Sequence, residues 1–171
     1  MSATSIELKA PAKLNLFLHV VGRRTDGMHL LESVFVLIDL CDDIVLELDP
    51  SGKISRTGDV IGDMDKDLCV RAARRLQQIS GTTIGCRIHV TKRIPAGAGM
   101  GGGSSDCAST LMGLNKLWGL NWPQEKLMSI GESLGADVPF FLFGQNAFAK
   151  GTGGILMPIA VPQAWVAVAM P

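Results

Sequence analysis

The sequence predicts an α+β fold. Strand-like segments lie before and between the helical ones, and they do not follow a regular β-α-β alternation. The chain has 171 residues, of which 47% are hydrophobic, which is enough to bury the core of one ordinary domain. With no repeat, linker or low-complexity segment to divide the chain, we expect residues 1–171 to form one domain.

The first fifty residues predict an antiparallel meander. Apolar and polar residues alternate in several segments that turn-forming residues separate. The expected strands are Ser5–Ala10, Lys13–Val20, His29–Leu40 and Ile44–Leu48. Pro11 divides the first two strands, and the turn Gly22–Gly27 precedes the third.

The second expected strand carries polar residues at alternate positions. One face takes Leu14, Leu16, Leu18 and Val20, and the other takes Lys13, Asn15, Phe17 and His19. Lys13 and Asn15 could therefore point together at a ligand, or they could belong to a solvated sheet face. The alternation alone leaves both interpretations open.

The later elements alternate between helix and strand. The polar stretch Ser51–Gly62 is typical of a hairpin or loop, and helical spacing of apolar residues predicts a helix over Asp67–Ile79. Ile84–Thr91 is a strand pattern. A helix should start at Ser104 or Ser105 and run to Trp118, and another should start at Pro123 and end at Gly135. The remaining strand-like or extended segments are Phe140–Phe143, Ala147–Lys150, Ile155–Met157 and Trp165–Met170.

A glycine-rich loop carries the strongest chemical signal. Five of its eleven residues are glycine, in the order Pro95, Ala96, Gly97, Ala98, Gly99, Met100, Gly101, Gly102, Gly103, Ser104 and Ser105. Glycine allows the backbone to approach a ligand closely and to turn successive amides toward an anion. The helix that follows offers its free N–H groups to phosphate. A mobile surface loop would leave this conformational freedom unused, so we interpret the segment as a phosphate-binding loop.

The loop differs from the two common nucleotide motifs. A P-loop requires Gly-Lys-Ser/Thr at its end, whereas Gly103 is followed directly by Ser104. The acidic residue of a dinucleotide-binding fingerprint, on a second parallel strand, is also absent.

Composition excludes several other classes. Sixteen basic and sixteen acidic residues balance, without the basic excess of a nucleic-acid binder. The sequence shows neither a signal peptide nor an apolar run of the roughly 20 residues that a membrane helix needs. The cysteines Cys41, Cys69, Cys86 and Cys107 form no C-x-x-C pair, which favours small core residues over a metal site. We expect a cytoplasmic protein without nucleic-acid or membrane partners.

Four segments resemble one kinase family. Pro95–Ser105 is similar to the second motif of the superfamily that joins galactokinase, homoserine kinase, mevalonate kinase and phosphomevalonate kinase. Pro11–Leu18, Asp26–His29 and Leu134–Pro139 resemble three motifs of the 4-diphosphocytidyl-2-C-methyl-D-erythritol kinase family, in the family's order. The resemblance implies the family's α+β N-terminal domain, which is similar to the second domain of ribosomal protein S5. It also implies that the family's second α+β domain is missing from this chain.

The resemblance assigns roles to individual residues. It makes Asp137 the catalytic base and Lys13 its charge partner, and it places Asn15, Met28 and His29 on the substrate side. Lys92 would lie on the adenosine side of ATP, which would bind along the loop with Mg²⁺ as its complex. The implied reaction phosphorylates the 2-hydroxyl of 4-diphosphocytidyl-2-C-methyl-D-erythritol, a small-molecule substrate of isoprenoid precursor synthesis.

Two residues depart from the family pattern. Met28 replaces a tyrosine that stacks on cytosine, and Asp67 replaces a common asparagine. Two alternatives remain, another kinase of the superfamily and an RNA-binding module. The Asp26–His29 and Pro11–Leu18 segments weigh against the first. Zero net charge and the matched Lys13 and Asp137 weigh against the second.

Overall fold

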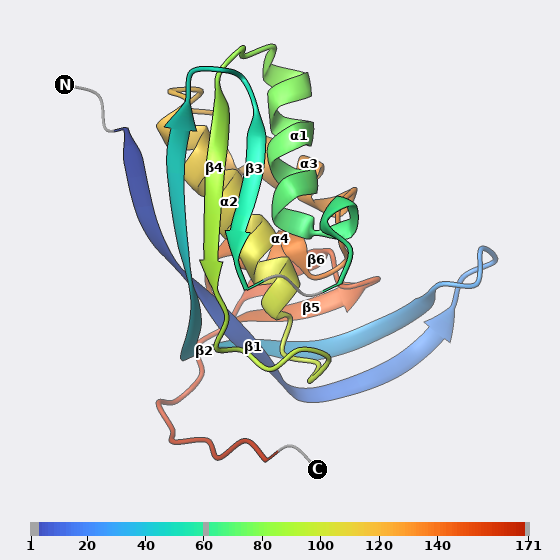
Figure 1. Ribbon diagram of the computed structural model, residues 1–171. Helices are drawn as coiled ribbons and strands as arrows, with labels where there is room; N and C mark the ends of the chain where they lie inside the picture. The colour runs from blue at the N-terminus through green and yellow to red at the C-terminus, as the bar shows by residue number, and fades with distance from the viewer. Residues whose placement is uncertain (1–3, 60–61, 170–171) are drawn as a thin grey trace.

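One mixed sheet forms the frame of the protein (Figure 1). The computed structural model describes residues 4–59 and 62–169. Its strands are β1 (Ser5–Arg23), β2 (His29–Asp49), β3 (Ile54–Gly58), β4 (Gly85–Thr91), β5 (Ala147–Gly151) and β6 (Ile155–Pro158). The order is β3-β4-β2-β5-β6, and β1 pairs with β2. The predicted α+β class is confirmed.

The long strand β2 joins two parts of the sheet. Its residues 43–49 pair with β4, and its residues 31–35 pair with β5, while β1 runs antiparallel to it along nearly its whole length. The sequence pattern divided both β1 and β2 into two strands, which was wrong. Pro11 lies opposite Cys41 and is followed by a register shift, so β1 accommodates the proline at an irregularity and continues.

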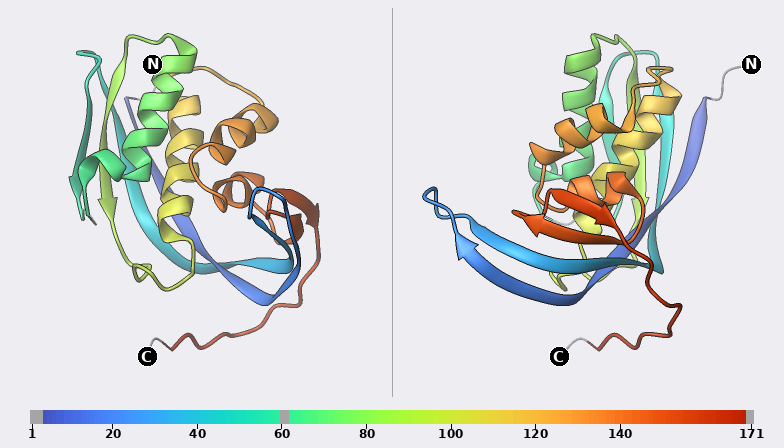
Figure 2. Two further views of the ribbon diagram at one scale, coloured as in Figure 1. Left: turned by 90° about the vertical axis from the view of Figure 1, so that its right-hand side faces the viewer. Right: turned by 180° about the vertical axis from the view of Figure 1, so that it is seen from behind.

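The helices pack on one face of this sheet (Figure 2). They are α1 (Leu68–Ser80), α2 (Gly102–Leu117), α3 (Gln124–Glu132) and α4 (Val138–Phe143), preceded by the short 3₁₀ helix η1 (Met64–Lys66). The core between sheet and helices is built from fully buried apolar side chains, among them Ile44, Leu46, Ile88, Leu76, Leu111 and Leu114. Among the described residues, no helix combines the length and apolar character needed to cross a bilayer.

Two local predictions were wrong, and a third segment, predicted as a strand or an extended segment, forms no strand over its described residues. Phe140–Phe143 belongs to helix α4 and not to a strand, because Pro139 suits a helix start and Gly144 ends the helix in the left-handed conformation. Its consecutive buried apolar residues hid the helical period. The Ser51–Gly62 stretch contains β3, which pairs parallel with β4. Residues 165–169 form no strand, and the indole of Trp165 is fully exposed; Met170 lies outside the described residues.

Candidate functional site

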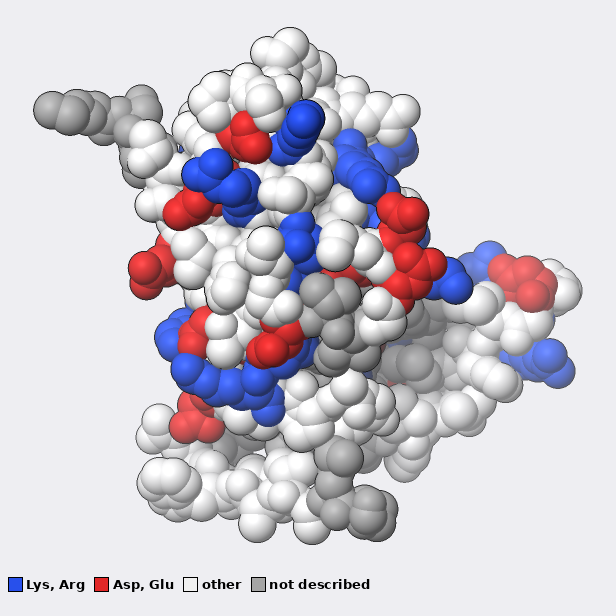
Figure 3. Space-filling view, in the orientation of Figure 1, with Lys and Arg blue, Asp and Glu red and all other residues white. Residues whose placement is uncertain are grey.

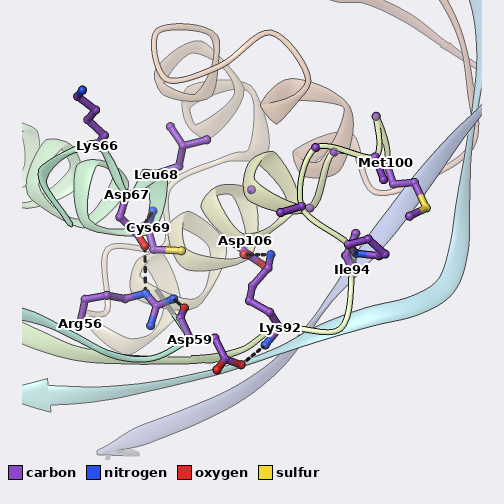
Figure 4. Close-up of a pocket in the computed structure, with 18 residues that line it drawn as sticks. Arg56, Asp59, Lys66, Asp67, Leu68, Cys69, Lys92, Ile94, Met100 and Asp106 are labelled. Carbon is purple, nitrogen blue, oxygen red and sulfur yellow. Dashed lines mark hydrogen bonds and ion pairs between the residues drawn. The ribbon is translucent and has the colours of Figure 1, made fainter. Parts of the chain in front are cut away.

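The glycine loop connects β4 to α2 and forms one wall of a pocket of about 270 Å³ (Figure 4). Gly97, Gly99 and Gly101 have φ values of 73°, 72° and 70°, which only glycine adopts readily. Loop residues 95–103 all line the pocket. The predicted loop therefore forms a wall of a cavity.

Helix α2 begins earlier than its serines suggested. Gly101 is the N-cap, no side chain caps this end, and the N–H of Ser105 makes the first turn's bond to the carbonyl of Gly101 at 2.9 Å. The N–H groups of residues 102–104 therefore have no partner within the helix, and they form an anion-binding end. A glycine start brings these amides to the pocket without an intervening side chain.

The two serines point away from this pocket. The hydroxyl of Ser105 is buried without a hydrogen-bond partner, and that of Ser104 lies 3.6 Å from the Cβ position of Gly135. Neither serine lines the pocket. Contact of Ser104 and Ser105 with the nucleotide phosphates or Mg²⁺ stays a prediction.

Lys92 lies beneath the start of α2. Its ammonium donates to the carboxylate of Asp42 and, at 2.7 Å, to Oδ2 of Asp106. Asp42 is fully buried, and its Oδ1 also accepts the N–H of Ile94 at 2.8 Å. Burial raises the pKa of Asp106 to about 7, against the opposing effect of Lys92. The resemblance placed Lys92 on the adenosine side, whereas its ammonium lies 3.3 Å from the Cβ position of Gly102 at the helix end. Sequence reasoning singled out neither carboxylate.

Lys13 and Asp137 meet beside the loop. The ammonium of Lys13 lies 3.4 Å from Oδ2 of Asp137 and donates to Oδ1 of Asn15 at 2.8 Å. The side chain of Lys13 is 5% exposed and that of Asp137 is 35% exposed, so the carboxylate is the member of the pair that can meet a substrate. The Lys13 ammonium also lies 4.4 Å from the centre of the Phe35 ring.

Two contacts hold this pair against the glycine loop. The N–H of Lys13 donates to the carbonyl of Met100 at 3.0 Å. A Cβ on Gly101 would lie 3.3 Å from the side chain of Lys13 and 2.8 Å from that of Phe141 in α4. Three segments that the sequence places far apart, β1, the loop and the start of α4, thus converge here.

The sequence was compared with protein families and with curated proteins. The family model described as "GHMP kinases N terminal domain" matches residues 67–145. The chain is 55% identical over 175 residues to a 4-diphosphocytidyl-2-C-methyl-D-erythritol kinase of Ralstonia pickettii, covering 100% of this chain and 61% of that protein. The chain contains a GHMP kinase N-terminal domain.

Solved structures of GHMP kinases agree with the fold. A crystal structure of a 4-(cytidine 5'-diphospho)-2C-methyl-D-erythritol kinase is 41% identical, with a TM-score of 0.81, over 92% of this chain and 56% of that one. A homoserine kinase from Cytophaga hutchinsonii shares the fold at 20% identity, with a TM-score of 0.69, over 95% of this chain and 54% of that one. The chain thus spans about three fifths of the length of the relatives it matches.

One departure from the family pattern has a structural counterpart in this GHMP kinase domain. The Asp67 side chain caps α1, accepting the N–H of Cys69 at 2.8 Å. Its other oxygen lies 3.2 Å from Nε of Arg56, whose side chain is 2% exposed (Figure 4). Both residues line the pocket. Sequence reasoning missed Arg56, which stands in the stretch interpreted as a loop.

The substrate-side residues lie along the arm formed by β1 and β2, which extends away from the helices in Figure 1. Met28 and His29 stand at its tip, where Met28 is 50% exposed and its N–H donates to Asp26 at 3.1 Å. Asn15 lies near the base and contacts Lys13. A register shift between Asn15 and Leu18 breaks the predicted alternation. Leu16, Leu18 and Val20, predicted to share one face, are all exposed on this arm.

Proposed function

We propose that this chain is the nucleotide-binding part of an ATP-dependent kinase for 4-diphosphocytidyl-2-C-methyl-D-erythritol. The observation that carries the proposal is the ion pair of Lys13 and Asp137 packed against Gly101 of the glycine loop. A phosphate held by the loop would then lie near a carboxylate that can accept a hydroxyl proton. Phosphoryl transfer needs this combination of positioning and charge stabilisation.

The chain's own residues divide the work in this proposal. The N–H groups at the start of α2 hold the nucleotide phosphates, and Asp137 orients and deprotonates the 2-hydroxyl of the substrate. Lys13 keeps that carboxylate charged and stabilises the transferring phosphoryl group. Asn15 fixes the Lys13 ammonium through its 2.8 Å hydrogen bond.

ATP and Mg²⁺ are the proposed cofactors. The pocket fits a nucleotide because the Cβ positions of Gly97 and Gly99 have no atom within 4 Å, which leaves room beside the backbone. Among the described residues, no three His, Cys, Asp or Glu side chains gather as metal ligands. We propose that Mg²⁺ arrives bound to the nucleotide, where it neutralises phosphate charge.

The substrate class is the small molecule named by the relatives. On the face in Figure 3, positive and negative side chains lie interspersed, which suits a small ligand better than a nucleic-acid backbone. In a protein at the full length of its relatives, we expect ATP-dependent phosphorylation of the diphosphocytidyl substrate. Homoserine and mevalonate, offered under the same conditions, should be far poorer substrates. Equal or better turnover of either would overturn the substrate assignment.

Met28→Tyr should tighten binding of the diphosphocytidyl substrate. Methionine lacks the aromatic face that the family's tyrosine offers to cytosine, and a lost aromatic pair is worth up to about 1–1.5 kcal/mol. We expect KM for that substrate to fall by up to about tenfold while KM for ATP stays constant. Met28→Leu is the matched control, because it changes size little and adds no ring. An unchanged KM in the tyrosine variant would show that the cytosine binds elsewhere.

A further inference from the structure

The ammonium of Lys92 is shared by two carboxylates at the base of the phosphate loop. It donates to Asp42 on β2 and, at 2.7 Å, to Asp106, the fifth residue of α2. It also lies 3.3 Å from the Cβ position of Gly102, the first residue of that helix. Because an ammonium has three N–H groups, one remains beneath the helix end where phosphate would bind. Lys92 and Asp106 both line the pocket.

The two carboxylates differ in how fully they are hydrogen-bonded. Oδ1 of Asp42 accepts the N–H groups of Arg93 and Ile94, and Oδ2 accepts Lys92. Asp106 is only 5% exposed, yet its Oδ1 has no hydrogen-bond partner. An unpaired buried carboxylate oxygen is costly when charged. A proton added to this cluster therefore belongs on Asp106.

The net charge of this cluster depends on that proton and affects how well a phosphate can bind beside it. With both carboxylates ionised, one lysine and two aspartates carry a net charge of −1. This charge repels a nucleotide phosphate at the adjacent helix end. Protonation of Asp106 makes the cluster neutral and leaves Lys92 attractive to phosphate.

We propose that Asp106 is a positioning residue that holds Lys92 under the phosphate loop and takes up a proton when a nucleotide binds. The inference rests on the proposed nucleotide-binding function. Nucleotide affinity should then fall as the pH rises, because the bound state holds more protons than the free state.

The surroundings of Asp106 support this direction. Burial raises its pKa to about 7, and the nearby Asp42 adds to the rise while Lys92 opposes it. A bound phosphate would raise the pKa further. The neighbouring thiols of Cys69 on α1 and Cys107 on α2 have pKa values raised by burial, to about 12 for Cys107, so they stay neutral across the range concerned. Asp106 is therefore the group in this cluster that titrates near neutral pH.

Calorimetric titration with MgADP tests the proposal in a protein at the full length of its relatives. Measuring the binding heat at pH 7.5 in buffers of different ionisation enthalpy gives the number of protons taken up. We expect an uptake of up to one proton, and an association constant that falls by up to about tenfold per pH unit above pH 7. Asp106→Asn should remove both effects, because an amide still accepts a hydrogen bond from Lys92 but cannot take up a proton.

Asp67→Asn is the matched control, since Asp67 lines the same pocket and contacts Arg56 instead of Lys92. The Asp67→Asn variant should keep the proton uptake. Any protons released by MgADP itself cancel when the variants are compared, because each of them binds the same nucleotide. Equal proton uptake by the unaltered protein and a folded Asp106→Asn variant would overturn the inference alone. If that variant does not fold, zero uptake by the unaltered protein at pH 7.5, after correction for the ionisation of free MgADP, overturns it equally. Failure to bind MgADP at any pH would overturn the proposed function as well.

Discussion

Asp137→Asn should lower kcat by about 10²–10⁴-fold in a protein at the full length of its relatives, the usual contribution of a general base. Asparagine keeps the size and hydrogen-bonding capacity of the side chain but cannot accept the hydroxyl proton. ATP binding should survive, because the backbone of the glycine loop is unchanged. Single-turnover phosphoryl transfer, which separates the chemical step from product release, is the measurement that checks this.

The partner of Asp137 in the ion pair gives a second test of the same mechanism. Lys13→Met should also lower kcat, because it removes the charge that lies 3.4 Å from Asp137. The two losses should not add in the double variant, since the residues act as a unit. Glu132→Gln is a matched variant on α3, outside the pair. A folded, ATP-binding Asp137→Asn protein with near-normal turnover would remove Asp137 from the proposed mechanism.

The strands and helices with strong periodicity could be predicted from sequence. Helix α1 lies over 68–80 where apolar spacing predicted 67–79, and β4 lies within one residue of its expected start. Helix α4 could not be found in this way, because Val138–Phe143 is buried on nearly every side and shows no polar face. The continuity of β1 through Pro11 depends on its partner strand, which local sequence cannot supply.

The residues of the candidate site were likewise predictable only where the local sequence carries a motif. The glycine loop, Lys13 and Asp137 were found through motifs, and the structure brings them together. Asp42 and Asp106 were missed, because nothing in the local sequence around either carboxylate indicates the partner that it meets in the fold. Asp42 and Lys92 are separated by 50 residues and meet because β2 pairs with β4, which ends just before Lys92.

Gly101→Val should destabilise the fold itself. The structure places Gly101 in close contact with side chains of β1 and α4. A Cβ there would lie 2.8 Å from Phe141 and 3.3 Å from Lys13, at a φ of +70° that valine rarely adopts. Backbone strain and overpacking each cost roughly 1–3 kcal/mol. We expect a clear fall in the free energy of unfolding, measured by denaturant titration.

Two further glycines separate these causes from phosphate binding. Gly97→Ala meets the same positive φ with no atom within 4 Å, so it should show the backbone strain without the clash.

Gly103 has no positive φ, and its Cβ would meet only Leu68 at 3.7 Å, beside the pocket. Gly103→Ala should leave the helix as stable, or more stable by up to about 1 kcal/mol. The added methyl should nevertheless lower ATP affinity by about tenfold or more, because it occupies space that the phosphates need at the helix end. Unchanged ATP affinity in this stable variant would contradict the phosphate-loop assignment, whatever Gly101→Val does to the fold.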